Sequence, residues 1–369
     1  MSEELSEIRR LLQLFVEVSG ASGFEAPIRK VISDEVASYA DETYTDQIGN
    51  LFFIKNGSNP NLPALIIMGH MDEIGMMVRF IDSKGFIRFS YLGGFFDQLV
   101  LGQRVLVHGS KGAVPGIIGS KPPHLMNAEE RKKVVTRENM FIDIGASSEK
   151  EVKALGIQTG DPITWIGPYL ELKNEKNDLI CGKALDNRVV LPIMIEVFKS
   201  VQNIAPLICV ASVREEIGLQ GARTSTYSLE IDRKIALGIS LDIALAGDYP
   251  LVKEEESPIF LRKGPTITIA QGSRDGLQDG YIITPNVRNF IIELAETHQI
   301  PYQLEIMEGG LTDATVIALT GRGIPTANLG IPTRYVHSPC EVASLTDIQN
   351  AIHLLTLITE NLPEKFESP

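Results

Sequence analysis

The chain has few cysteines and no long apolar run, and these two absences narrow its class. Its 3 cysteines among 369 residues are odd in number, lie far apart and form no CxxC pair. A disulfide framework and a thiolate zinc site are therefore not expected. No apolar stretch approaches the roughly 18 residues of a membrane span, and the acidic start MSEELSEIRR lacks a signal-peptide core. We expect a reduced, cytoplasmic protein without a membrane partner.

Positive charge is also scarce, because 47 acidic residues outnumber 34 basic ones and give a formal net charge of −13. This balance argues against nucleic acid or an anionic membrane as the main partner. What is present is ordinary for a globular protein, with 44% hydrophobic and 22% charged residues. Disordered and collagen-like classes are therefore excluded. The length allows two or three domains of roughly 100–200 residues each.

Hydrophobic periodicity predicts an α/β layer at both ends of the chain. Apolar residues at helical spacing within residues 5–16 and 28–36 predict two helices, and two strands follow them. From about Leu179 helices and strands alternate again, which is typical of a mostly parallel sheet. The predicted strands are Asn50–Lys55, Ala64–Met68, Leu207–Val213 and Ala236–Leu241, and the later helices are Val189–Val201, Asn286–His298 and Leu345–Asn361.

The segment between these parts has a different sequence pattern, with short strand candidates separated by glycine-rich turns. The candidates are Met76–Ile81, Phe86–Tyr91, Gln103–His108, Val114–Ile118, Phe141–Ile144 and Pro162–Ile166. Helices are expected there at Ala128–Arg137 and Glu149–Leu155. This sequence pattern favours a small β-barrel-like or sandwich unit. The sequence therefore predicts an α/β domain over residues 1–74 and 171–369, interrupted by an inserted β-rich domain over residues 75–170.

Metal-type ligands stand at the ends of several predicted strands. They are His70 and Asp72, Asp186, the pair Glu215 and Glu216, Asp242, and His337. Ligands in open α/β sheets bind beyond the carboxyl ends of the strands, so these side chains can converge. Taken singly, each has an ordinary explanation as a helix cap, a turn residue or a solvated surface group. The pattern alone leaves both interpretations open.

Other catalytic signatures are missing from the sequence. It contains no GxSxG elbow, no GxxxxGK[ST] phosphate loop and no HExxH helix. The remaining histidines, at positions 108, 124, 298 and 353, are expected to be structural or on the surface. Carboxylate and imidazole ligands without a thiolate fit Zn²⁺, Co²⁺ or Mn²⁺. A metal site is therefore the chemistry that the sequence favours among those considered.

Four motifs together resemble the M42 family of metallo-aminopeptidases, which includes the tetrahedral (TET) and glutamyl aminopeptidases. The motifs are Gly69-His70-Met71-Asp72-Glu73-Ile74-Gly75, Lys183-Ala184-Leu185-Asp186-Asn187-Arg188, Glu215-Glu216-Ile217-Gly218-Leu219-Gln220-Gly221-Ala222 and Arg334-Tyr335-Val336-His337-Ser338-Pro339. Weaker matches occur at Asp46–Asn50, Lys121–His124, Phe141–Ala146 and Gly309–Ala314. The resemblance spans nearly the whole chain, in order.

The resemblance implies a role for each matched residue. The metal ligands would be His70, Asp186, Glu216, Asp242 and His337, which together hold two divalent ions, Zn or Co first and Mn as the alternative. Asp186 would bridge the ions, Glu215 would be the general base, and Asp72 would orient His70. Gly310, Thr312 and Asp313 would contact the substrate. In that loop Leu311 is inserted relative to a shorter Gly-Gly-Thr-Asp-Ala form of the family.

The resemblance also implies a fold, a reaction and an assembly. The fold would be a phosphopeptidase-like α/β domain, with a mixed sheet flanked by helices, and an inserted β-barrel-like (PDZ-like) dimerisation domain. The reaction would remove N-terminal residues from short peptides by attack of a metal-activated water. Dimers would build a homo-oligomer, a tetrahedral dodecamer. The resemblance does not imply one side-chain preference, because glutamyl, leucyl and lysyl specificities occur in the family.

Three other functions remain as alternatives. A metal-dependent deacylase of N-acyl amino acids or peptides would share the same metal chemistry. A glycoside hydrolase, an endoglucanase-type activity, needs two carboxylates about 5–10 Å apart and would leave His70, Asp242 and His337 without a role. A non-catalytic scaffold would leave the candidate base Glu215 without a role.

Overall fold

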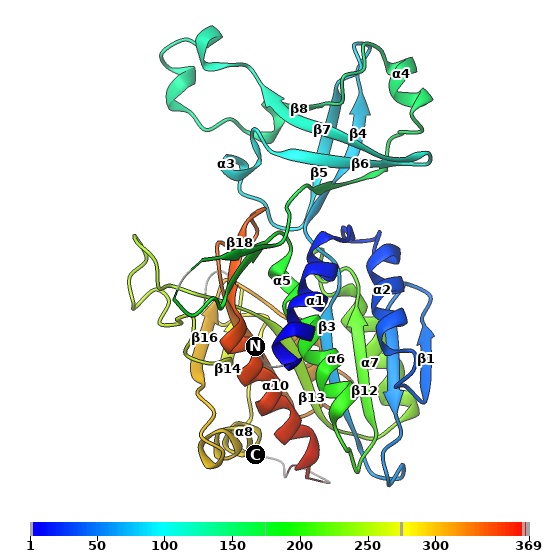
Figure 1. The fold of residues 1–369 in the computed structure, drawn as a ribbon, viewed down its shortest axis with the longest axis vertical. Coiled ribbons are helices and arrows are strands. Elements are labelled where there is room, and N and C mark those ends of the chain that lie inside the picture. The colour runs from blue at the N-terminus through cyan, green and yellow to red at the C-terminus, as the bar shows by residue number, and fades with distance from the viewer. Residues whose placement is uncertain (1–2, 174, 274–275, 364–365, 367–369) are drawn as a thin grey trace.

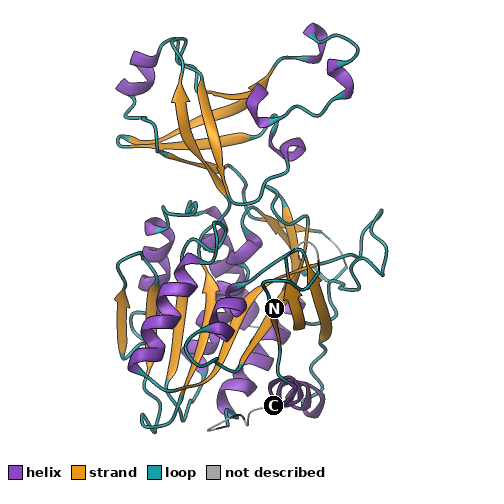
Figure 2. Ribbon diagram, turned by 180° about the vertical axis from the view of Figure 1, so that it is seen from behind, coloured by secondary structure: helices purple, strands orange, loops and turns teal. Residues whose placement is uncertain are grey.

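The structure is a computed structural model that describes residues 3–173, 175–273, 276–363 and 366. It has two parts, a large sheet covered by helices and a smaller barrel above it (Figure 1). The chain builds the first helices and strands of the large part, passes through the barrel, and returns to complete the sheet. The view from behind shows the same two parts (Figure 2).

The large part holds a 12-stranded mixed sheet within the described residues. Its main path is β1 (Glu42–Thr45), β2 (Leu51–Lys55), β12 (Leu207–Ser212), β3 (Ala64–His70), β13 (Ile235–Leu245), β17 (Thr326–Arg334), β18 (Glu341–Ser344), β11 (Leu179–Gly182) and β10 (Leu170–Leu172). Strands β14 (Thr266–Gly272), β15 (Tyr281–Ile282) and β16 (Gln303–Glu308) branch from β17. The expectation of a mostly parallel sheet is wrong: β12, β3, β13 and β17 are parallel neighbours, and the flanking pairs are antiparallel apart from β14 with β16.

Helices cover both faces of this sheet. They are α1 (Glu3–Glu17), α2 (Ala26–Val36), α5 (Leu185–Arg188), α6 (Val190–Ser200), α7 (Gln220–Asp232), α8 (Pro285–Thr297), α9 (Asp313–Leu319) and α10 (Leu345–Glu360). Successive side chains of a strand point to opposite faces, so Leu65 and Ile67 of β3 join one core while Ile66 and Met68 join another. This is why the run Ala64–Met68 is apolar throughout. None of the described helices is long and apolar enough to cross a membrane.

The inserted part is a closed antiparallel barrel, as the sequence predicted. Its strands, in order around the barrel, are β4 (Gly75–Ile81), β5 (Ile87–Leu92), β8 (Met140–Asp143), β7 (Gly112–Ser120), β6 (Arg104–Gly109) and β9 (Pro162–Trp165). It has its own core, which includes Met76, Val105, Ile142 and Trp165. Closure leaves the barrel few free edges. Two short helices, α3 (Asp97–Val100) and α4 (Glu149–Ala154), decorate it.

One predicted helix of the barrel is wrong and one is confirmed. The stretch Ala128–Arg137 contains only short 3₁₀ turns, at Glu130–Lys132 and from Arg137 onward. Most of this stretch is exposed, so it has no apolar face to pack, and packing supplies most of a helix's stability. The helix expected near Glu149–Leu155 forms as α4, where the Ser148 hydroxyl accepts a hydrogen bond from the backbone N–H of Glu151.

Candidate active site

The structure brings the predicted ligands and the predicted base to one edge of the sheet. They are His70 at the end of β3, Asp186 in α5, Glu215 and Glu216 after β12, Asp242 in β13 and His337 after β17. Strands β12, β3, β13 and β17 are parallel neighbours, so their carboxyl ends meet at this edge. All six side chains line one cavity of about 470 Å³.

Two groups of candidate ligands share Asp186, and a third group consists of His70, Glu215 and Glu216. In the first group, His70 Nε2 lies 3.2 Å from Asp186 Oδ1 and 4.0 Å from Asp242 Oδ1. In the second group, His337 Nε2 lies 3.3 Å from Asp186 Oδ2 and 3.3 Å from Glu216 Oε2. Asp186 therefore directs one carboxylate oxygen to each group, which is the arrangement expected of a bridging ligand.

The spacing and pairing of these atoms fit bound metal ions. Two ligand atoms on one zinc ion lie roughly 3.3 Å apart, because each bond is about 2.0–2.1 Å long. Asp186 Oδ1 and Glu216 Oε1 are buried and have no hydrogen-bond partner. Buried polar atoms are normally satisfied, so these two oxygens have the environment of metal donors. The set of imidazole and carboxylate donors fits two divalent ions of the zinc, cobalt or manganese type.

The pKa values of the clustered side chains also favour bound cations. Burial raises the pKa of Glu215 well above its usual value, and the nearby Asp242 and Glu216 add to this rise while His70 opposes it. Burial acts to lower the pKa of His70, but Glu215, Asp186 and Asp72 outweigh it and raise this pKa well above its usual value. The site therefore holds more negative charge than its own side chains neutralise, and bound cations would offset the excess.

Asp72 joins the first histidine to the backbone of the Glu215–Glu216 segment. The carboxylate is fully buried, and His70 Nδ1 lies 3.1 Å from the backbone oxygen of Asp72 and 3.4 Å from its carboxylate Oδ1. Its two oxygens accept hydrogen bonds from the backbone N–H groups of Glu215 and Glu216, at 3.0 and 3.3 Å, and from the Ser22 hydroxyl at 2.6 Å. These contacts are those required of a residue that orients His70, and they also fix the backbone of the candidate base.

A buried ion cluster joins the segment that follows His70 to the segment that precedes Asp186. Glu73 is fully buried and accepts a hydrogen bond of 2.6 Å from Lys183 Nζ and another of 2.9 Å from the backbone N–H of Gly20. Arg188, also fully buried, donates to the backbone oxygen of Phe15. The loop after β3 and the loop after β11 therefore share paired charges, which are costly to separate in a protein interior.

Sequence reasoning missed one further carboxylate of the site, Glu341. It is 2% exposed, and its two oxygens accept hydrogen bonds of 2.8 Å from the backbone N–H groups of Asp186 and His337. Glu341 thus holds Asp186, the candidate bridging ligand, and His337 in fixed positions relative to each other. The sequence signal that could have indicated Glu341 is its position four residues after His337. Its second partner, Asp186, is 155 residues away and gives no local signal.

The predicted substrate loop lies at the same cavity only in part. Gly310 and Thr312 line the cavity, together with the inserted Leu311. Asp313 lies behind this lining, where its carboxylate accepts a hydrogen bond of 2.6 Å from the Ser212 hydroxyl. Burial raises the pKa of Asp313 to about 6. A direct contact of Asp313 with substrate is therefore less favoured by the geometry than contacts of Gly310 and Thr312.

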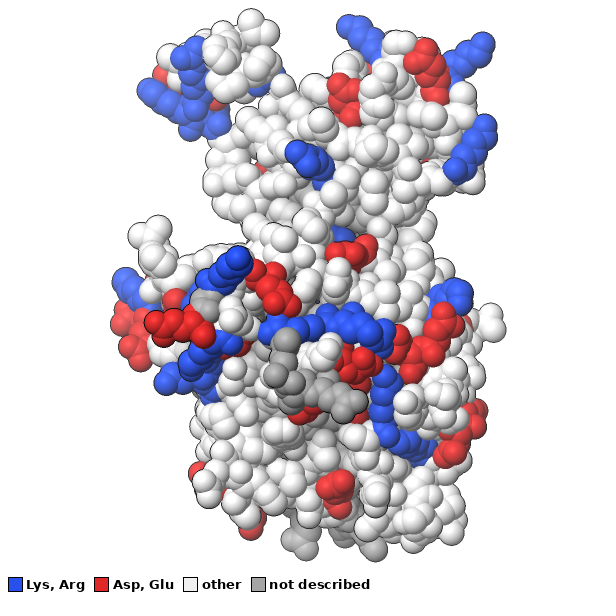
Figure 3. Space-filling view, viewed as in Figure 1, with Lys and Arg blue, Asp and Glu red and all other residues white. Residues whose placement is uncertain are grey.

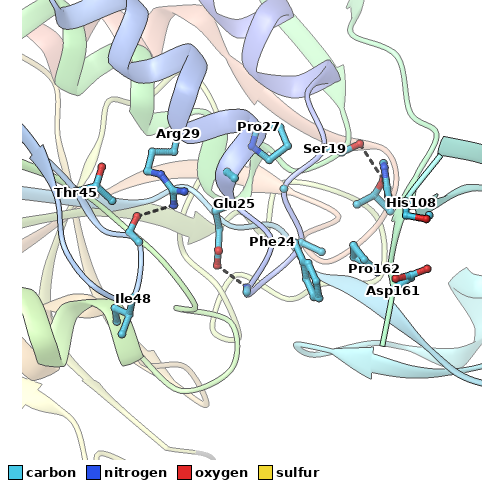
Figure 4. Close-up of a pocket in the computed structure, with 18 of the residues that line it drawn as sticks. Ser19, Phe24, Glu25, Pro27, Arg29, Thr45, Ile48, His108, Asp161 and Pro162 are labelled. Atoms are coloured by element: carbon cyan, nitrogen blue, oxygen red, sulfur yellow. Dashed lines mark hydrogen bonds between the residues drawn. The ribbon is translucent and has the colours of Figure 1, made fainter. Parts of the chain in front are cut away.

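A second cavity, of about 630 Å³, lies between the loop after α1 and the barrel (Figure 4). None of the predicted metal ligands lines it. Its wall includes Glu25, whose carboxylate accepts hydrogen bonds from the backbone N–H groups of Gly23 and Arg214. Since Arg214 directly precedes the candidate base Glu215, this wall contacts the segment that carries that residue.

Comparisons with known proteins agree with this geometry. Residues 49–354 match the sequence profile of the family described as M42 glutamyl aminopeptidase. The lysyl aminopeptidase of Pyrococcus furiosus is 32% identical over 95% of this chain and 96% of its own. Among solved structures, an aminopeptidase from the archaeon Desulfurococcus kamchatkensis is 34% identical, with a TM-score of 0.91 over 98% of this chain and 97% of its own.

A second solved structure is a Pyrococcus horikoshii TET1 peptidase, described as able to assemble into a tetrahedron or a large octahedral shell. It is 28% identical, with a TM-score of 0.83 over 96% of this chain and 100% of its own. The profile match covers most of the sequence, and the folds agree over nearly the whole chain. This chain therefore belongs to the M42 family of aminopeptidases, hydrolases that act on peptide bonds.

Proposed function

We propose that the protein is a dinuclear-metal aminopeptidase that removes N-terminal residues from short peptides. The observation that carries this proposal is the placement of Asp186 between two groups of ligands, beside the carboxylate of Glu215, whose side chain is 10% exposed. His70 and Asp242 would complete the site of one ion, and Glu216 and His337 that of the other. Zinc or cobalt is the proposed metal, with manganese as the alternative.

In this proposal Glu215 is the general base. Its Oε2 lies 3.8 Å from His70 Nε2, so it is next to the proposed ligands. This distance is longer than the 3.2–3.3 Å contacts that the two histidines make with Asp186 and Glu216. Two bound divalent ions would supply Lewis acidity and a water of lowered pKa. Glu215 accepts the proton of the attacking water and passes it to the leaving amine. Asp72 holds the backbone of Glu215 and so fixes where the proton is taken.

The excess of carboxylates suits a substrate that carries a free α-ammonium group. A positive charge is attracted to acidic side chains in a poorly solvated cavity, whereas an N-acyl group offers no such charge. This favours an aminopeptidase over a deacylase on the same metal pair. The proposed metal pair also gives His70 and His337 a role as ligands, whereas a glycoside hydrolase would leave both without a role.

The test is a comparison of free and N-acetylated dipeptide amides before and after chelation. We expect hydrolysis of the free peptides only, loss of activity with a chelator, and recovery when zinc, cobalt or manganese is added back. Faster hydrolysis of the acetylated peptides would instead identify a deacylase. Activity on β-glucan that survives full removal of metal would identify a glycoside hydrolase.

We also propose that residues 75–170 form a dimerisation domain and that residues 1–74 and 171–369 form the catalytic domain. Phe80, Phe96 and Ile117 of the inserted segment are 57–58% exposed. Much of the barrel face in Figure 3 carries no charged side chain. Large exposed apolar patches mark protein–protein interfaces, and we propose that these side chains belong to such an interface. Dimers would then build a tetrahedral dodecamer, and the free cysteines suit a cytoplasmic, reducing location.

Light scattering of the purified protein measures this assembly. With 40.5 kDa per chain, a dodecamer is easily distinguished from a dimer or a monomer. We expect the dodecamer, and we expect Phe80→Lys combined with Ile117→Lys to give smaller species because charge is costly to bury in an apolar interface. A fully active wild-type monomer would contradict the proposed assembly.

A further inference from the structure

The cavity that holds the proposed metal ligands has an apolar wall. Its other side chains include Ile243, Leu245, Met307, Leu311 and Val336. Among the described residues that line it, there is no lysine or arginine, and the acidic ones are Asp186, Glu215, Glu216 and Asp242. All four of these acids already have a role in the proposed reaction.

These apolar side chains reach the cavity from several segments. Leu245 ends β13, three residues beyond Asp242, and it is 47% exposed. Met307, on β16, is 7% exposed, and the inserted Leu311 follows it in the loop that leads to α9. The apolar wall is therefore built beside the proposed ligands, where the side chain of an N-terminal residue would lie.

This wall has consequences for the side chain that it receives. An apolar side chain gains free energy in proportion to the surface that it removes from water. A negatively charged side chain loses its hydration and finds no lysine or arginine as a partner among the described lining residues. The four carboxylates are already assigned to the proposed ions, the proton transfer and the α-ammonium group of the peptide, so none of them is left as a partner for a lysine side chain at the apolar wall.

We infer that the enzyme prefers peptides whose N-terminal residue has a neutral, apolar side chain, such as leucine or methionine. The inference rests on the proposed aminopeptidase function and names its substrate class. It sets this chain apart from the lysyl aminopeptidase to which it is similar, and from the glutamyl activity in the family's description.

The first experiment compares four aminoacyl p-nitroanilides, those of leucine, methionine, lysine and glutamate, with the metal-loaded enzyme. We expect kcat/KM for leucine and methionine to exceed the values for lysine and glutamate by roughly 100-fold or more, as for a pocket without a charge partner. A preference for lysine or glutamate would overturn the inference and leave the proposed function intact. Failure to cleave any of the four, with metal bound, would instead refute the proposed function.

The second experiment places a charge in the wall. Leu245→Lys is expected to improve the glutamate-to-leucine ratio of kcat/KM by about tenfold, and Leu245→Glu the lysine-to-leucine ratio by a similar factor. Leu304→Lys is the matched control, because Leu304 is also a strand leucine, 49% exposed on β16, and does not line the cavity. Leu304→Lys should keep the wild-type ratios. Equal ratios in all three variants would show that this wall does not select the side chain.

Discussion

Glu215→Gln is expected to lower kcat by roughly 10²–10⁴-fold while the protein keeps its metal. The amide has the shape of the carboxylate but cannot accept the proton of the attacking water. The Glu215 side chain is not needed to hold its own segment, because Asp72 bonds to the backbone N–H rather than to the side chain. The measurement is kcat together with the metal content of the same preparation by elemental analysis.

Glu216→Gln is the matched control, since the same change is made one residue along the chain. Glu216 Oε2 lies 3.3 Å from His337 Nε2, within the second group of candidate ligands. This variant should lose metal from the second group, and added metal should restore part of its activity. If Glu215→Gln lost the metal and Glu216→Gln kept it, the assignment of base and ligand would be reversed.

The ends of the central strands could be predicted from the sequence, and with them most of the site. The run Ala64–Met68 is apolar at every position because both faces of β3 are covered, and the strand ends only two residues later, at His70. Polar residues after other apolar runs indicated Glu215, Glu216 and Asp242 in the same way, although β13 continues past the predicted end and contains Asp242. Local hydrophobicity shows where such a strand runs and chain direction shows which end it points to. This is sufficient to predict these residues, because neighbouring parallel strands place their carboxyl ends at the same side of the sheet.

Contacts between distant segments could not be predicted in this way. Glu341 stands at the first position of β18, where it pairs with Gly182 of β11, and this pairing carries it towards Asp186. No periodicity predicts which strand β18 joins. The same holds for Met307, which reaches the cavity from β16, a strand that has no counterpart among the predicted strands. Such residues depend on sheet order, which local patterns do not encode.

Glu341 holds a part of the site that has an uncommon backbone conformation. His337 has φ 61°, in the left-handed region that residues other than glycine seldom adopt. Its N–H group donates to Glu341 Oε1, while the N–H of Asp186 donates to Oε2. The carboxylate thus satisfies two backbone donors, one buried and one partly buried, and fixes two proposed ligands relative to each other. We regard it as a positioning residue, because it reaches the ions only through these ligands.

Glu341→Gln is expected to weaken metal binding by about 10–100-fold, the usual effect of losing a partner that orients ligands. The amide keeps one acceptor oxygen but presents an NH₂ group to the other backbone N–H, so one of the two bonds is lost and two donors face each other. The affinity is measured by competition with a chromogenic chelator, a readout that does not depend on activity. Glu341→Ala should have the same direction and a larger effect, because both acceptors are removed.

Asp347→Asn separates this effect from a general loss of stability. Asp347 is a fully buried carboxylate that also clamps two backbone N–H groups, those of Arg262 and Gly264, at 2.6 and 2.8 Å. It touches none of the proposed ligands in the described contacts, so its amide variant should lower the melting temperature of the metal-free protein much as Glu341→Gln does. Only Glu341→Gln should also weaken metal binding. If both variants lowered the affinity equally, the clamp on Asp186 and His337 would be no more than one buried polar contact among many, and the positioning role would be refuted.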